Sequence, residues 1–168
     1  MVRKMTEKSL SEGFAGESMA HMKYLIFSEV AEREGFHNVA RLFKAIAYAE
    51  FVHAKNHYNV LGNVKSSKEN LQSAIEGETY EVMEMYPAFK AVAELQGEKS
   101  ALRSFDWAYN AEKIHAKIYE NAKASVEKGA DAQIGDIYIC PICGYTVEGT
   151  PPEKCPICGA KRESFKKF

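Results

Sequence analysis

Two short segments of the chain combine residue types that can bind one metal ion together. They read AEFVHAK, which contains Glu50 and His53, and AEKIHAK, which contains Glu112 and His115. Side chains three residues apart on a helix lie on one face, so each Glu and His can reach the same ion. A carboxylate within an apolar helical stripe must be neutralised, paired or bound to a metal. One such pair could be a buried salt bridge, but two copies with matching flanks indicate a metal site.

The two segments belong to a longer internal repeat. Glu112 and His115 each lie 62 positions after Glu50 and His53. The segment at 77–79 (GET) lies 61 positions after the segment at 16–18 (GES), and Tyr86 lies 62 positions after Tyr24. The spacing predicts two copies of one helical hairpin, each with a Glu on its first helix and Glu-x-x-His on its second.

The repeat also indicates which carboxylates complete the site. Glu17 and Glu78 occupy matching positions on the first helix of each copy. The second copy adds Glu81, which shares a helix face with Glu78, whereas the first copy has Ala20 at the matching position. Five converging carboxylates would repel one another strongly, and two iron ions would relieve this repulsion. Carboxylate and imidazole ligands suit iron or manganese.

Four helices are predicted to position these residues. We expect them at about 7–34, 38–61, 67–96 and 98–128, each followed by a glycine. Thr6 is a candidate N-cap of the first helix, and Ser66 with Glu69 fits a capping box at the start of the third. Pro87 lies inside the third helix and is expected to kink it.

Two Glu-bearing helices and two Glu-x-x-His helices resemble the di-iron carboxylate proteins with a ferritin-like four-helix bundle. Glu81 and the short Cys-rich tail make the chain similar to the rubrerythrin family over nearly its whole length. The resemblance implies an all-α ferritin-like bundle over residues 1–134 and a rubredoxin-like domain over 135–168.

The resemblance also implies a role for each ligand. Glu50 and Glu112 would bridge two non-haem irons, and Glu78 and His115 would serve one of them. Glu17 would serve the other iron, with Glu81 exchanged for His53 on reduction. A tyrosine phenol, Tyr24, is expected to hydrogen-bond to a site carboxylate, and Tyr86 occupies the matching position.

Other histidines and aromatic residues near the predicted sites have simpler interpretations. His21 lies one turn from Glu17 and could be a ligand, but a structural histidine is the preferred interpretation. His57 is interpreted as supporting or structural, and His37 as a residue at a helix end. Trp107 lies beside the ligand face and is assigned to packing.

The C-terminal tail contains a second candidate metal site. Cys140 and Cys143 form one CPICG knuckle, and Cys155 and Cys158 form another. Four thiolates at this spacing form a tetrahedral site, which the motif alone allows to hold zinc or iron. The resemblance and the nearby di-iron site favour one iron that carries electrons. The glycine after each second cysteine permits a tight turn whose amides point at sulfur.

The tail is also expected to have its own small core and a linker that joins it to the helices. Tyr138, Tyr145 and Phe165 are expected to form its aromatic core. The segment at 130–136 is small and polar, and is predicted to be a linker.

Bulk properties exclude some classes of protein. The chain has 168 residues, of which 46% are hydrophobic and 27% charged, and its formal net charge is −1. This balance gives no indication of binding to nucleic acid or an anionic membrane. No apolar run approaches the roughly 20 residues of a membrane span, and the N-terminus does not resemble a signal peptide. We therefore expect a cytoplasmic protein, whose reducing environment would keep the thiols free.

The rubrerythrin resemblance implies a non-haem peroxidase that reduces hydrogen peroxide to water. Electrons would reach the di-iron site through the four-cysteine iron, from a rubredoxin or an NAD(P)H-dependent reductase. A ferroxidase that handles iron is one alternative, although it would not need a tail that delivers electrons. A redox sensor without enzymatic activity is another.

The short connector at 62–66 predicts the assembly. In ferritin-like bundles the second and third helices run parallel, so the connector must span a helix of roughly 36 Å. Five residues reach only roughly 17–20 Å. Two chains that exchange helical hairpins in a domain-swapped homodimer would solve this, whereas a simple up-down-up-down bundle would not need the exchange. About 24 Å of helix separates Glu112 from the linker, which suggests that the tail docks near the partner's site.

Overall fold

The computed structural model describes residues 2–168, which form two compact units. The first unit ends at Lys65 and contains α1 (Lys4–Arg33) and α2 (His37–Val60). The second begins at Ser66 and contains α3 (Ser67–Tyr80), the π-helical turn η1 (Glu81–Met85), α4 (Tyr86–Leu95), α5 (Lys99–Val126) and the tail. No helix within residues 2–168 is both long enough and apolar enough to span a membrane.

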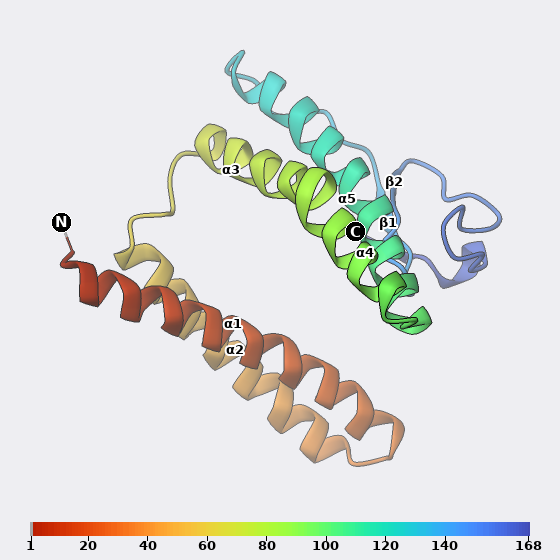
Figure 1. Cartoon of the computed structure of the whole chain (residues 1–168), viewed down its shortest axis with the longest axis horizontal. Helices are drawn as coiled ribbons and strands as arrows, with labels where there is room; N and C mark the ends of the chain where they lie inside the picture. The colour runs from red at the N-terminus through yellow and green to blue at the C-terminus, as the bar shows by residue number, and fades with distance from the viewer. Residues whose placement is uncertain (1) are drawn as a thin grey trace. The chain divides into compact units, whose positions relative to one another are not determined.

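The first unit is an antiparallel helical hairpin (Figure 1). The two helices approach closely because small residues lie between them, and Ala40 and Ala47 of α2 are fully buried. The turn between them places Gly35 at φ +83°, a conformation that favours glycine, as the sequence predicted. The prediction of Thr6 as the N-cap is wrong, because α1 already begins at Lys4, after Arg3.

The second hairpin begins as predicted but differs from the predicted single helix. The Ser66 hydroxyl accepts a hydrogen bond from the Glu69 amide, and the Glu69 carboxylate accepts one from the Ser66 amide, which confirms the capping box. The predicted third helix is divided by η1, in which the Tyr86 amide donates to the Glu81 carbonyl. Pro87 lies two residues after this turn ends and has no backbone N–H to donate within a helix. The irregularity expected at Pro87 is therefore a π turn that precedes it.

Aromatic clusters show that the two hairpins repeat each other. In the first, the ring of Phe27 lies 6.3 Å from Tyr24 and 5.6 Å from Phe43. The second hairpin has the same cluster at positions 62 residues later, with the same two separations: Tyr86, Phe89 and Phe105. The repeat in the sequence is thus a repeat in packing.

The tail forms a small three-stranded antiparallel sheet with strand order β2-β1-β3. Its elements are β1 (Ile137–Ile139), β2 (Thr146–Glu148), the short 3-10 helix η2 (Arg162–Ser164) and β3 (Lys166–Lys167). The 130–136 segment has no regular structure, as predicted for a linker. Tyr145 and Phe165 meet edge to face and pack against the buried cysteines, and Trp107 of α5 joins them. Trp107 therefore packs as predicted, and it does so against the cysteine site.

Candidate metal centres

One group of potential metal ligands lies inside the second unit. Glu78 comes from α3, and Glu112 and His115 come from α5. His115 Nδ1 lies 2.5 Å from Glu112 Oε2 and 3.9 Å from Glu78 Oε1. One ligand atom of each residue lies within 4.8 Å of the others. The packing of α3 against α5 thus brings together the predicted Glu and Glu-x-x-His ligands of the second copy.

The first unit contains the matching group, formed by Glu17 of α1 and by Glu50 and His53 of α2. His53 Nδ1 lies 2.9 Å from Glu50 Oε2 and 4.0 Å from Glu17 Oε1. This arrangement repeats that of the second unit. The two groups differ in exposure, because the side chain of His53 is 54% exposed and that of His115 is 28% exposed.

The carboxylates of the second group interact strongly with one another. Burial and a hydrogen bond to Glu112 raise the pKa of Glu78 to about 7. Burial opposes the charged form of Glu112 as well, but hydrogen bonds from His115 and Glu78 outweigh it and lower the Glu112 pKa. The bond to Glu112 raises the pKa of His115. One proton thus partly offsets a concentration of negative charge that a cation could neutralise.

Glu81 and Tyr86 lie at the two sides of the π turn and belong to the same environment. Burial raises the pKa of Glu81, and the negative charge of Glu112 raises it further. The pKa of Tyr86 is raised by burial and by the charges of Glu81, Glu112 and Glu78. Both residues therefore lie within electrostatic reach of the predicted ligands.

The π turn itself was missed from the sequence, although a signal for it exists. The offset between the two copies is 61 at Glu78 and 62 at Tyr86, so the second copy contains one extra residue between them. A π turn accommodates one extra residue within a helix, and such turns occur frequently at functional sites. The change of offset indicates where the extra residue lies, and η1 occupies that segment.

Other candidates lie outside the two groups. His21 Nδ1 bonds to the Ala47 carbonyl at 2.7 Å, which agrees with its structural interpretation. The ring of His57 packs closely against Gly13, where an added Cβ would lie 3.0 Å from the ring. His37 pairs with Glu32 at the start of α2. Tyr24 lies in the aromatic cluster, and its predicted bond to a site carboxylate stays a prediction.

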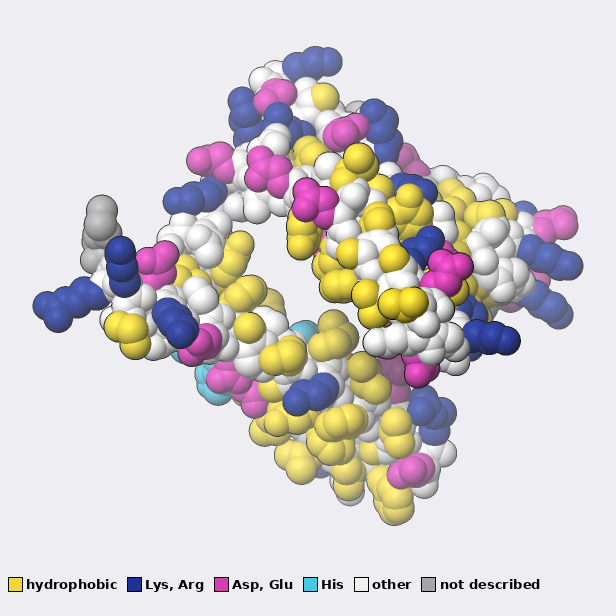
Figure 2. All heavy atoms as spheres, in the orientation of Figure 1, with side chains coloured by type: hydrophobic (Ala, Val, Ile, Leu, Met, Phe, Trp, Pro, Cys, Tyr) yellow, Lys and Arg dark blue, Asp and Glu magenta, His cyan; other side chains and the backbone are white. Residues whose placement is uncertain are grey.

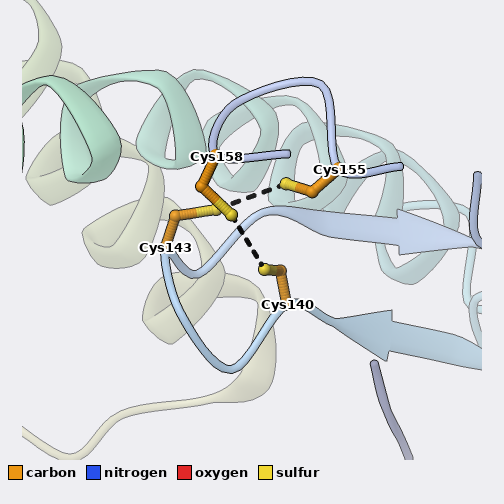
Figure 3. Close-up of side chains that lie close together, drawn as sticks. All are labelled: Cys140, Cys143, Cys155 and Cys158. Carbon is orange, nitrogen blue, oxygen red and sulfur yellow. Dashed lines mark hydrogen bonds between the residues drawn. The ribbon is translucent and has the colours of Figure 1, made fainter. Parts of the chain in front are cut away.

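The four cysteines form a separate site in the tail. Their side chains point toward one another from two loops (Figure 3). The sulfur atoms of Cys140 and Cys158 are 3.5 Å apart, and those of Cys143 and Cys155 are 3.4 Å apart. A tetrahedral metal site with bonds of about 2.3 Å has sulfur separations of roughly 3.8 Å, so a small expansion separates this arrangement from a loaded site.

Backbone amides point at the sulfur atoms, as expected for these turns. Gly144 and Gly159 both have φ +78°, which turns the backbone back over the cysteines. Amides of Cys158 and Ile157 donate to the Cys155 sulfur and lower its pKa, although burial opposes this. Burial raises the pKa of Cys143, and the amide of Tyr145 acts against that rise. Such bonds favour thiolate ligands and help to set the reduction potential of an iron–sulfur site.

The expectation that the tail lies far from the Glu112 group of its own chain is wrong. The tail folds back along α5, where β2 packs. Thr146 Oγ1 lies 2.8 Å from His115 Nε2, and an added Cβ on Gly144 would lie 3.8 Å from the Ala111 side chain. The distance along the helix overestimated the separation because the linker reverses the chain direction after α5.

Comparisons with known proteins agree with both sites. The family model described as rubrerythrin matches residues 8–123, and the model of the rubrerythrin rubredoxin-like domain matches residues 138–166. Rubrerythrin-2 of Clostridium acetobutylicum is 47% identical over 98% of this chain and 97% of its own.

The chain belongs to the rubrerythrin family. Nigerythrin of Nitratidesulfovibrio vulgaris is 34% identical over 97% of this chain and 86% of its own length. A solved structure described as the fully reduced, all-ferrous state of nigerythrin has a TM-score of 0.58, with 34% identity. It covers this whole chain and 88% of the nigerythrin chain.

The donor groups of this chain fit the di-iron centre and the thiolate-bound iron that the rubrerythrin family implies. Each carboxylate group supplies two Glu and one His with ligand atoms close together, which suits iron or manganese. Burial and the neighbouring Glu112 raise the pKa of Glu78, and a bound cation would favour its ionised form. The tail supplies four free cysteines, three of them buried. The donor sets are therefore consistent with a di-iron centre and one thiolate-bound iron.

We predict that the stability of the metal-free rubrerythrin falls as pH rises from about 4.5 to about 7 because of Glu78. In this window the folded chain retains a Glu78 proton that the unfolded chain has lost, so the free energy of unfolding decreases with pH. Glu78→Gln should lower this pH dependence. Urea unfolding at pH 5 and pH 8, with chelator present, measures the effect.

The matched control is Glu76→Gln, an exposed carboxylate on the same helix. It should leave the pH dependence as in the wild type. An equally steep decrease for Glu78→Gln and the wild type would contradict the assignment.

Proposed function

We propose that this rubrerythrin is a peroxidase that reduces hydrogen peroxide to water. The observation that carries the proposal is the direct contact between a carboxylate–histidine group and the four-cysteine tail. Each turnover consumes one peroxide, two electrons and two protons, and yields two water molecules. A bound di-iron centre would supply the two electrons that cleave the O–O bond.

The side chains of the chain would hold and tune that centre. By resemblance to the family, Glu50 and Glu112 would bridge the two ions, and each lies within reach of a second Glu and a His. Tyr86 keeps its phenol proton at neutral pH because burial and nearby carboxylates raise its pKa. Its Oη could therefore donate a hydrogen bond to an oxygen bound nearby.

Electrons would enter at the tail from a rubredoxin or an NAD(P)H-dependent reductase. The four-cysteine site is suited to one-electron transfer because amides donate to its sulfur atoms. A ferroxidase or a redox sensor could use the same bundle. A protein that releases iron has no need for a thiolate site in contact with a carboxylate group.

We also propose that His53 and Glu81 exchange as ligands of one ion. His53 is the more exposed of the two ligand histidines, whereas His115 is bonded to the tail. Glu81 belongs to the π turn, and its counterpart in the first copy is Ala20. His115 is therefore fixed by a hydrogen bond to the tail, whereas His53 is more exposed.

The assembly proposed is a homodimer that exchanges helical hairpins. Hydrophobic side chains gather over α1 and α2 in Figure 2. Several large ones are exposed: Met22, Ile26, Leu42, Ile46 and Phe51. A face of this kind is typical of a surface that another protein segment covers. Each unit contains one half of the ligand set, so pairing units from two chains would produce two complete centres.

Cys155→Ser tests the peroxidase and the route of its electrons. The variant should lose steady-state peroxide reduction with an external donor, because the thiolate site no longer accepts electrons. After chemical reduction, its bundle should still consume one equivalent of peroxide. Peroxide consumption and retained iron are measured together.

Ile142→Ala is the control, because Ile142 is an exposed knuckle residue that is not a ligand candidate. It should retain turnover. If the wild type instead turns over iron with oxygen, a ferroxidase is supported, and if neither substrate is consumed, a sensor is supported.

His53→Ala tests the ligand exchange. The variant should keep its oxidised di-iron centre, because Glu81 serves the ion in that state. It should lose peroxidase rate by at least roughly 10–100-fold, which is the cost of losing only an outer partner of a metal ligand. Rapid-mixing kinetics with peroxide measure the rate, and His57→Ala is the control from the same helix. Full turnover by His53→Ala would eliminate the exchange.

A mixed dimer of Glu17→Ala and Glu112→Ala chains tests the assembly. In a swapped dimer both substitutions fall in one centre and leave the other intact, so the purified mixed dimer should retain about half of the wild-type di-iron content. In an unswapped dimer each centre carries one substitution. Metal analysis of dimers isolated with two different affinity tags distinguishes the two, and absence of an intact centre would refute the exchange.

A further inference from the structure

Two hydrogen bonds connect the carboxylate group of the second unit to the cysteine tail. Thr146 Oγ1 donates to the Gly144 carbonyl at 3.0 Å. A hydroxyl has only one proton to donate, so at 2.8 Å it accepts from His115 Nε2. This leaves His115 Nδ1, which faces Glu112 and Glu78, as the nitrogen available to a metal.

The contact is built into the fold. Thr146 is only 5% exposed and Ala111 only 1%. Gly144 lies close to the Ala111 side chain, and its φ of +78° is a conformation that favours glycine. The backbone turn at Gly144 and the small side chain of Ala111 allow the tail to approach α5 closely enough for Thr146 to reach His115.

Two short routes from the cysteines to His115 pass through the Thr146 hydroxyl. One runs from Cys143 along the backbone to the Gly144 carbonyl, and then across the hydrogen bond to Thr146. The other crosses from the Cys143 sulfur to the Tyr145 amide, which donates to it, and continues along the backbone to Thr146. The routes converge at Oγ1 and continue through one hydrogen bond to the imidazole.

We propose that Thr146 is a positioning residue that couples the four-cysteine site to His115 of the same chain. The inference rests on the proposed redox role of the two metal sites. In each transfer, one electron leaves the four-cysteine site, which is oxidised, and reaches the centre bound by His115, which is reduced. Thr146 orients the imidazole and carries the connection, and no bond is broken along the route.

The test is the rate of transfer between the two sites, with peroxide absent. The fully oxidised protein is mixed with less than one equivalent of a one-electron donor that bleaches the tail colour. Return of that colour reports transfer into the bundle. Thr146→Val, which replaces the hydroxyl with a methyl group, should slow the return by roughly 10–100-fold, as expected when a partner of a metal-bound histidine is removed.

Three further variants separate coupling from folding. Thr146→Ser keeps a hydroxyl and should restore the rate, and Thr146→Ala removes it without adding bulk and should be slow. Thr150→Val, at an exposed threonine of the same tail, should match the wild type. An unchanged rate in both Thr146→Val and Thr146→Ala would overturn the proposal and would favour transfer to a site on the partner chain.

A second readout needs no redox activity. In protein loaded with zinc at both sites, the His115 Nε2 proton should exchange slowly with solvent, because it is donated to buried Thr146. Nuclear magnetic resonance should detect this proton in the wild type and in Thr146→Ser, and its protection should be lost in Thr146→Val. Protection that persists in Thr146→Val would refute the hydrogen bond, whatever the outcome of the peroxidase assay.

Discussion

Electrostatic repulsion among partly buried carboxylates is the constraint on which this structure depends. Glu78 and Glu112 lie close enough to share a proton, and Glu81 adds a further negative charge to the same environment. Burial makes each charge more costly than it would be in water. The helices that carry these residues pack through small and aromatic side chains, so they cannot separate the charges without losing that packing. A cation bound between the carboxylates would neutralise their repulsion and let the helices keep their packing.

Much of the helical bundle could be predicted because its signals are local and repeated. Helix ends at glycines, the capping box of Ser66 and the Glu-x-x-His spacing each depend on a few neighbouring residues. The members of each predicted ligand group lie close together in the structure, because their positions also depend on such local signals. The start of α1 was misjudged because a favourable cap at Thr6 does not prevent a helix from beginning earlier.

The position of the tail could not be predicted from such signals. It depends on contacts between residues more than thirty positions apart, above all those of Gly144 with Ala111 and of Thr146 with His115. Glycine and threonine in a short loop are common for many reasons, so their role emerges only when α5 lies beside them. Within the second unit, this contact gives His115 a hydrogen-bond partner from the tail.

The extra residue accommodated by η1 has a consequence for how such a protein can diversify. Inserting one residue into a regular α-helix rotates everything beyond it by about 100°, which would turn the following apolar face away from its neighbours. The π turn absorbs the insertion locally, so Tyr86 and Phe89 keep the packing of their counterparts in the first copy. A duplicated hairpin can therefore gain a residue beside its ligand group while the rest of its helices keep the packing of the other copy. Functional asymmetry then arises from a single inserted codon rather than from a new fold.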